Sequence, residues 1–157
     1  MKTIITPSEA VRTAWATGEY VPPEAVGEAD IAAAEERYIV PVTGRALADA
    51  LASGRYGELR SDYVLPAAAM YVRLSLQQSM DIRTGQVGSV VQSGACCDPA
   101  SAEARAAGLG SLRRRASSLL RRLSDRLDAD AAAYPEYDPR ANILKHCSID
   151  GGIAQIF

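Results

Sequence analysis

Three cysteines and one histidine are the side chains that could act as nucleophiles or soft metal ligands in this chain. A cysteine nucleophile needs an imidazole within hydrogen-bond distance of its sulfur. His146 directly precedes Cys147, however, and adjacent side chains on an extended chain point apart. A zinc site would have to combine this pair with Cys96 and Cys97, without the usual C-x-x-C spacing. We therefore expect neither thiol catalysis nor a bound metal.

Glycines and paired carboxylates give no enzyme site either. The glycines at 85 and 88, and those at 108 and 110, lack the spacing of a phosphate-binding loop or a dinucleotide fingerprint. Glu35 and Glu36 lie on a predicted helix, where neighbouring carboxylates point to different faces, so we expect a solvated surface rather than an acid–base pair. The chain is predicted not to be an enzyme and to need no cofactor.

Arginines are concentrated in one stretch, SLRRRASSLLRRLSDRLDADAAAY at residues 111–134. Guanidinium groups bind carboxylates in a bidentate manner, so this stretch is a candidate interface. Three interpretations are open: a solvated face with local pairs such as Arg121–Asp125, a contact with carboxylates of a second copy, and direct DNA binding. DNA is the least favoured, because no aromatic residues interleave with the arginines and the formal net charge is −2. The candidate interface residues here are Arg113, Arg114, Arg121 and Arg122.

Acidic residues are concentrated near the other end of the chain. Between Glu9 and Glu36 there are seven acidic residues and one arginine. A chain with an acidic region and a basic region can bind a copy of itself.

Length and composition indicate one domain. The 157 residues are enough to bury a real core. No run of about 18 apolar residues predicts a membrane span, and the N-terminus lacks the apolar core of a signal peptide. The odd number of cysteines fits a reducing, cytoplasmic environment.

Helical periodicity defines two long elements. Residues 111–134 carry an apolar stripe that consists of Leu112, Ala116, Leu119, Leu120, Leu123 and Leu127. Residues 58–80 predict a second long helix, apolar nearly all round and therefore buried, which we expect to pack antiparallel to the first. Pro66 should cause a bend or a fresh first turn. A separate helical piece over residues 101–107 is expected to break at Gly108 and Gly110.

Three short helices are predicted before this pair. The first begins at Thr6 or Ser8, either of which can cap a helix. The second covers about residues 28–39 and is stopped by Pro41. The third covers residues 45–52 and ends at a glycine C-cap.

The fold class that follows is mainly α. It is a bundle of two long antiparallel helices and three short N-terminal helices in a single domain of residues 1–157. A small β-hairpin or loop is predicted as an insertion at residues 84–94, where valines favour strands and glycines favour turns. The candidate interface residues of this insertion are Gly85, Val87 and Val90.

The tail, residues 135–157, is predicted to be extended and to end in a strand. Ile153, Ile156 and Phe157 alternate with smaller residues, and these three complete the set of candidate interface positions. A lone strand needs an edge to pair with, because its backbone groups are otherwise unsatisfied. The hairpin near residues 87–91 and a neighbouring copy are the two candidate edges.

This order of elements resembles the small head–tail connector (head-completion adaptor) proteins of tailed bacteriophages, in particular a variant found in phages and prophages of Bacteroides-type bacteria. The likeness covers nearly the whole chain, and the motifs that carry it are structural rather than catalytic. They are TPSEA at residues 6–10, AEERYIVPVTG at 34–44, DIRTGQ at 81–86, YPEYDP at 134–139 and CSIDGG at 147–152.

The resemblance implies a structural virion protein without enzymatic activity. Its copies would form a ring beneath the portal, extend the DNA channel and dock the tail or a stopper protein. The implied partners are further copies of the chain, the portal protein, a tail or stopper protein, and packaged DNA that passes without sequence-specific binding. The implied location is the head–tail junction of the virion, and the host cytoplasm before assembly. The alternative is a small helical nucleic-acid-binding or regulatory protein that uses the arginine-rich helix.

Overall fold

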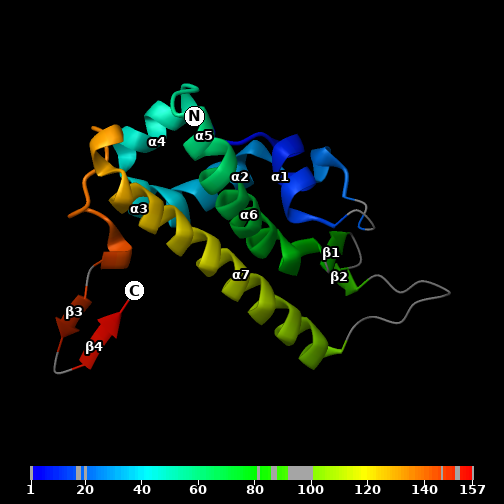
Figure 1. Ribbon diagram of the computed structural model, residues 1–157. Helices are drawn as coiled ribbons and strands as arrows, with labels where there is room; N and C mark the ends of the chain where they lie inside the picture. Colours follow the sequence, from blue (N-terminus) through cyan, green and yellow to red (C-terminus); the bar gives the residue numbers. More distant parts are fainter. Residues whose placement is uncertain are drawn as a thin grey trace.

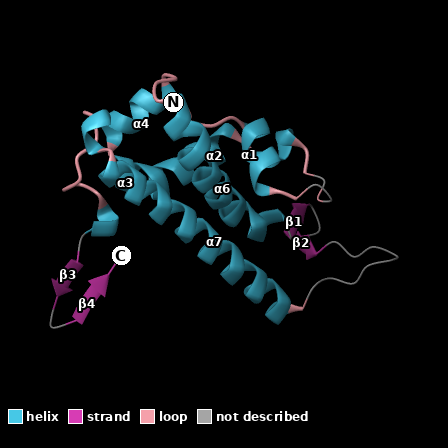
Figure 2. Ribbon diagram, viewed as in Figure 1, coloured by secondary structure: helices cyan, strands magenta, loops and turns pink. Residues whose placement is uncertain are grey.

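The computed structural model describes residues 2–16, 19, 21–80, 82–85, 88–91, 101–145, 147–150 and 153–156. In this part of the chain the protein is mainly α-helical, as predicted (Figure 1, Figure 2). The candidate positions Val87 and Phe157 lie outside the described residues, as do Cys96, Cys97 and His146.

Helix α6, Leu65–Met80, lies at the centre of the fold. It packs against α1 (Pro7–Ala14) and α2 (Glu28–Ala34), and on its other side against α7 (Ala102–Ala129), which runs antiparallel to it (Figure 1). This position requires a helix that is apolar on most sides. The residues of α6 that are at most 1% exposed are Ala67, Ala68, Ala69, Met70 and Val72.

Two five-residue π-helical turns, Glu35–Ile39 and Arg60–Val64, each lie just before a proline. In each turn the residue that precedes the proline donates its N–H five residues back, from Val40 to Glu35 and from Leu65 to Arg60. A proline in an α-helix clashes with the carbonyl four residues earlier and cannot bond to it. The wider π turn spaces the carbonyls so that both problems are relieved.

Both helices continue through their prolines because of these turns. The helix that begins with α2 runs through Pro41 into α3 (Val40–Thr43), so the predicted stop at Pro41 is wrong. It ends at Gly44, whose φ of +79° lies in the region that favours glycine. The helix that begins with α5 (Gly57–Leu59) continues through the second π turn into α6, and Pro66 is the second residue of α6.

The ends of helices α1 and α4 are set by capping residues and glycines close to them in the sequence. At α1 the Thr6 hydroxyl accepts the N–H of Glu9 at 3.3 Å, and the Glu9 carboxylate accepts the N–H of Thr6 at 2.8 Å. This capping box makes Thr6, and not Ser8, the cap. Helix α4, Arg45–Ala52, has the predicted bounds, and Gly54 follows it with a φ of +94°. Three 3₁₀ turns complete the helical part: η1 (Pro23–Ala25), η4 (Ala131–Ala133) and η5 (Ile143–Lys145).

Helix α7 is a single unbroken helix, so the predicted break at Gly108 and Gly110 is wrong. Ser101 caps its start, where the hydroxyl accepts the N–H of Ala104 at 3.1 Å. A glycine inside a helix costs only about 1 kcal/mol relative to alanine, and the packing of the rest of α7 on α6 outweighs that cost. The predicted stripe is confirmed: Ala116, Leu120, Leu123 and Leu127 are buried, and Leu112 and Leu119 are partly buried against the core.

Two antiparallel strand pairs extend from the helical body. Strand β1 (Ile82–Gly85) pairs with β2 (Gly88–Val91), with Ile82 opposite Val91. Strand β3 (Cys147–Asp150) pairs with β4 (Ile153–Ile156), with Cys147 opposite Ile156. The partner of the last strand is therefore β3, and neither of the two edges considered from the sequence. The two pairs lie on opposite sides of the molecule (Figure 1).

A buried polar cluster holds the start of the tail against α7, and this part of the tail consists of turns that include η5. The side chain of Asn142, which is fully buried, donates to the hydroxyls of Ser124 and Tyr137 at 2.8 Å each. The Tyr137 hydroxyl in turn donates to Asp128 at 2.9 Å. Lys145 forms an ion pair with the same Asp128.

Candidate functional site: the arginine face of helix α7

Five exposed arginines lie on the side of α7 that faces away from the core. We call this surface, which consists of Arg113, Arg114, Arg115, Arg121 and Arg122, the arginine face. Intervals of four residues bring side chains above one another on a helix. Arg113 and Arg121 are thus in one row with Ser117 between them, and Arg114 and Arg122 are in the next row with Ser118 between them.

The two rows line a shallow hollow of about 640 Å³ on the surface of α7. Its walls are guanidinium groups and serine hydroxyls, with a single carboxylate, Asp125, at one end. A second hollow of about 490 Å³ lies between α7, α6 and the first π turn. Both hollows include Arg113 and Ser117, so they form one continuous cationic surface.

The second hollow adds Arg37, an arginine that the sequence analysis did not select. Arg37 lies on the π turn Glu35–Ile39 and its guanidinium is 5.3 Å from the ring centroid of Tyr38. Tyr38 itself stacks on Tyr71 of α6, with ring centroids 4.0 Å apart. No sequence pattern marks Arg37, because its direction depends on the extra residue of the π turn.

Most of the arginine face has no carboxylate partner within the described chain. Among the described residues, Arg113, Arg114, Arg115 and Arg121 form no ion pair, so the predicted local pair of Arg121 with Asp125 is absent. Arg122 instead lies over the Tyr63 ring, 4.9 Å from its centroid.

Outside the arginine face, Arg12, Arg37 and Arg140 likewise form no ion pair with other described residues, but other arginines do. Five of them form ion pairs with carboxylates: Arg45 with Glu36, Arg55 with Glu136, Arg60 with Glu9, Arg73 with Glu19 and Arg126 with Asp130. The arginine face therefore gathers on one helix several guanidinium groups that are free to form bidentate contacts with carboxylates or phosphates.

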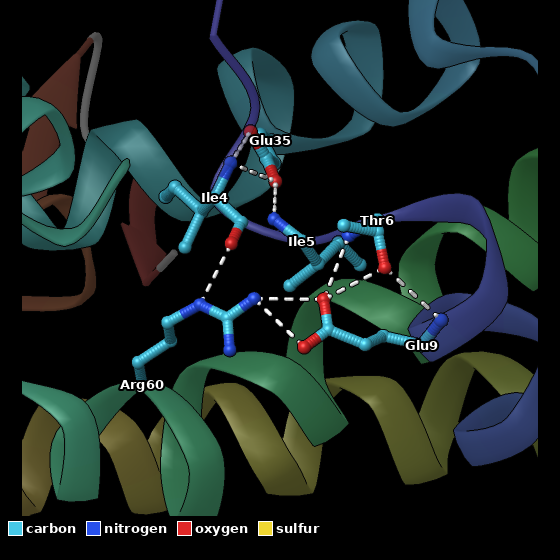
Figure 3. Close-up of polar contacts among 6 residues, drawn as sticks. All are labelled: Ile4, Ile5, Thr6, Glu9, Glu35 and Arg60. Atoms are coloured by element: carbon cyan, nitrogen blue, oxygen red, sulfur yellow. Dashed lines mark hydrogen bonds and ion pairs between the residues drawn. The ribbon is translucent and has the colours of Figure 1, made fainter. Parts of the chain in front are cut away.

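A second polar cluster, which we call the N-terminal clamp, consists of the buried Ile4, Ile5 and Glu35 and the partly buried Glu9 and Arg60 (Figure 3). The Glu35 carboxylate accepts the N–H groups of Ile4 and Ile5 at 2.9–3.0 Å. Arg60 donates to the Ile4 carbonyl at 2.9 Å and to the Glu9 carboxylate at 2.7 and 2.8 Å. Each charged group is thus bound to backbone or to its counter-ion, which makes the clamp a structural joint.

The clamp corrects one prediction from the sequence. Glu35 is 5% exposed, so the predicted solvated surface is wrong for Glu35. Burial raises the pKa of this carboxyl above its ordinary value, although the backbone hydrogen bonds and Arg60 lower it in part. Glu36 is exposed and pairs with Arg45, in agreement with the prediction.

The remaining candidate positions do not join the arginine face. Gly85 and Val90 lie in the β1–β2 pair, and Ile153 and Ile156 lie in β4. These two groups are on opposite sides of the molecule (Figure 1), so the structure does not bring the predicted positions into one site.

The described residues contain neither a metal-binding cluster nor a membrane-spanning helix. No group of three or more histidine, cysteine or acidic side chains there is arranged to hold a metal ion. No helix in the described ranges is both long enough and apolar enough to cross a membrane.

A family model, described as a family of unknown function (DUF6712), matches residues 27–145, which is more than half of the chain. The chain belongs to the DUF6712 family. No curated protein and no solved structure matches it. The DUF6712 region covers α2 through α7 and thus contains the whole arginine face together with Arg37, Glu35 and Arg60. Helix α1 and the β3–β4 pair lie outside it.

Proposed function

We propose that the protein is a non-enzymatic structural component of a tailed bacteriophage, a head–tail connector. In this role its copies form a ring beneath the portal, extend the DNA channel and provide a docking surface for the tail or a stopper protein. It acts at the head–tail junction of the virion and is present in the host cytoplasm before assembly. The sequence resemblance described above supports this proposal, and so does the kind of surface that the molecule presents.

The arginine face is the observation that carries the proposal. It combines five exposed guanidinium groups with serine hydroxyls on one long helix that is packed on the core. Because the helix is packed on the core, such a surface can present its charged groups to a macromolecular partner in a fixed arrangement. A connector subunit requires surfaces of this kind, because it works only through contacts with its neighbours.

The charge distribution also fits a channel that DNA passes through. The chain has seventeen cationic and nineteen acidic residues, and five of the cations lie on the arginine face, so the remainder carries a net formal charge of −7. Arginines attract phosphates, whereas the acidic remainder opposes tight wrapping of a duplex. Transient contact with DNA, without sequence-specific binding, is the expected result.

The test is whether the protein is part of phage particles. We would induce a host that carries the phage or prophage, purify the particles, and identify proteins by mass spectrometry and chemical cross-linking. The proposal expects this chain in the particles, cross-linked to the portal, and DNA-filled heads without tails when its gene is deleted. Normal tailed particles after the deletion would overturn the proposal.

A second candidate function is nucleic-acid binding by a regulatory protein, and the missing carboxylate partners of the arginine face favour it. This function predicts DNA binding that weakens steeply with salt. The measurement is fluorescence anisotropy of labelled DNA with the wild type and with a variant in which Arg113, Arg114, Arg121 and Arg122 are glutamine. Weak binding that is equal in the two proteins would exclude this function.

A further inference from the structure

Most carboxylates of the acidic N-terminal region are already bound within the fold. Three of its carboxylates are held by side chains of other elements: Glu9 by Arg60, Glu19 by Arg73 and Glu36 by Arg45. Glu35 is buried on backbone N–H groups. The large acidic face suggested by the sequence is thus reduced to a short segment.

We call this segment, which consists of Glu24, Glu28 and Asp30, the acidic segment. All three side chains are exposed, on η1 and the first turn of α2. Asp30 accepts the N–H of Gly27 at 3.1 Å, while Glu24 and Glu28 form no ion pair or hydrogen bond with any other described residue. No lysine or arginine occurs between Arg12 and Arg37 in the sequence.

The arginine face and the acidic segment cannot meet within one chain. Helix α6 lies between α7 and the layer formed by α1 and α2 (Figure 1). The arginine face has a single carboxylate, Asp125, and the acidic segment has no cation near it in the sequence, so the two charged surfaces lie apart on one molecule.

We infer that the arginine face binds the acidic segment of a second copy of this chain. A contact between two different surfaces of identical molecules is heterologous, and its repetition gives a ring or a filament. The inference rests on the proposed function in one respect, since it names the contact by which connector subunits would join.

The aromatic rings near the arginine face favour a second copy over a nucleic acid. The nearby aromatic rings are already covered, because Tyr63 lies beneath Arg122 and Tyr38 stacks on Tyr71. Each ring thus has one face occupied within the chain, which disfavours the base stacking that single-stranded nucleic acids use beside charge.

Charge reversal tests the inference on the full-length protein. One variant carries Arg113→Glu and Arg121→Glu, a second carries Glu24→Arg and Glu28→Arg, and a third carries all four changes. Sedimentation velocity at millimolar protein and low salt measures association, and circular dichroism verifies that each variant folds. A matched control reverses Lys2 and Arg140, which are exposed cations outside the arginine face and form no ion pair with other described residues.

The expected pattern is specific. The wild type and the control associate at low salt and dissociate at high salt, each two-residue variant sediments as a monomer, and the four-residue variant associates again. A monomeric wild type, or association that the two-residue variants retain, would overturn the inference. So would the loss of DNA affinity in the first variant with unchanged self-association, since the occupant would then be a nucleic acid.

The outcome is independent of the phage assignment. The connector proposal fails if the protein is missing from particles, whatever its self-association. The contact proposed here fails if charge reversal has no effect on association, even when the protein is found at the portal.

Discussion

Glu35 and Arg60 hold the same residue from its two polar sides. The Glu35 carboxylate accepts the N–H of Ile4 at 2.9 Å, and the Arg60 guanidinium donates to the carbonyl of Ile4 at 2.9 Å (Figure 3). Each of the two side chains is the first residue of a π-helical turn. The two irregular turns thus have a common result, which is to fix the N-terminal segment over the core.

Replacement of Glu35 by alanine should destabilise the protein by about 2–3 kcal/mol, because the buried N–H groups of Ile4 and Ile5 would lose their acceptor. Urea denaturation measures the change. Glu36→Ala is the matched control and should cost less than about 0.5 kcal/mol, since the Glu36–Arg45 pair is exposed. Equal effects of the two substitutions would show that the clamp contributes little.

Glu9 should make part of the free energy of unfolding depend on pH in the acid range. Burial raises the pKa of this carboxyl, but hydrogen bonds from Arg60 and Thr6 outweigh burial and leave the pKa below its ordinary value of 4.5. A lowered pKa stabilises the fold above pH 4.5, and the stabilisation is lost as the pH falls through the folded-state pKa. The stability difference between the wild type and Glu9→Gln should therefore shrink on acidification below pH 4.5. A difference that is constant with pH would contradict this.

Replacement of Asn142 by alanine should loosen the tail. Its side chain is fully buried and donates to Ser124 and Tyr137, so its loss leaves polar groups without a partner and costs about 1–3 kcal/mol. Limited proteolysis and hydrogen exchange should both report faster opening of residues 134–145. Arg140→Ala, an exposed change in the same segment, is the control and should leave the rates unchanged.

Substitutions on the arginine face should separate binding from stability. Arg121→Gln should change the free energy of unfolding by less than about 0.5 kcal/mol, as is usual for an exposed side chain. Arg122→Gln should cost about 0.5–1 kcal/mol, because Arg122 lies over the Tyr63 ring. Thermal unfolding of both variants tests this. A large loss of stability in Arg121→Gln would mean that the arginine has a structural role.

The regular helices were predictable because the apolar period and the glycines that mark them are local patterns in the sequence. The stripe of α7 repeats with the helical period, and Leu123 and Leu127 are buried as that period requires. The bounds of α4 follow from the glycines on either side of it. At Gly108 the local rule failed, because the cost of one glycine is small relative to the packing of a 28-residue helix.

The clamp and part of the arginine face could not be predicted from the sequence. Glu35 is buried because a segment 31 residues earlier in the chain closes over it, and no local pattern records that contact. Arg37 reaches the second hollow because of a π turn, and a proline such as Pro41 predicts a stop more often than a π turn. The arginines of α7 were visible in the sequence. That most of them have no carboxylate partner could be seen only from the positions of the surrounding acidic side chains in the structure.

A π turn contains one residue more than an α turn, so each of the two turns is equivalent to an insertion of one residue. Successive residues of a helix are rotated by about 100°. Deletion of one residue within 36–39 would return the helix to plain α geometry and rotate everything before it by about that angle relative to α3. Glu35 and Ile4 would then be displaced together from Arg60, which donates to the Ile4 carbonyl. The same deletion would restore the clash of Pro41 with the carbonyl four residues earlier, so the extra residue of the π turn serves both the continuity of the helix and the position of the N-terminus.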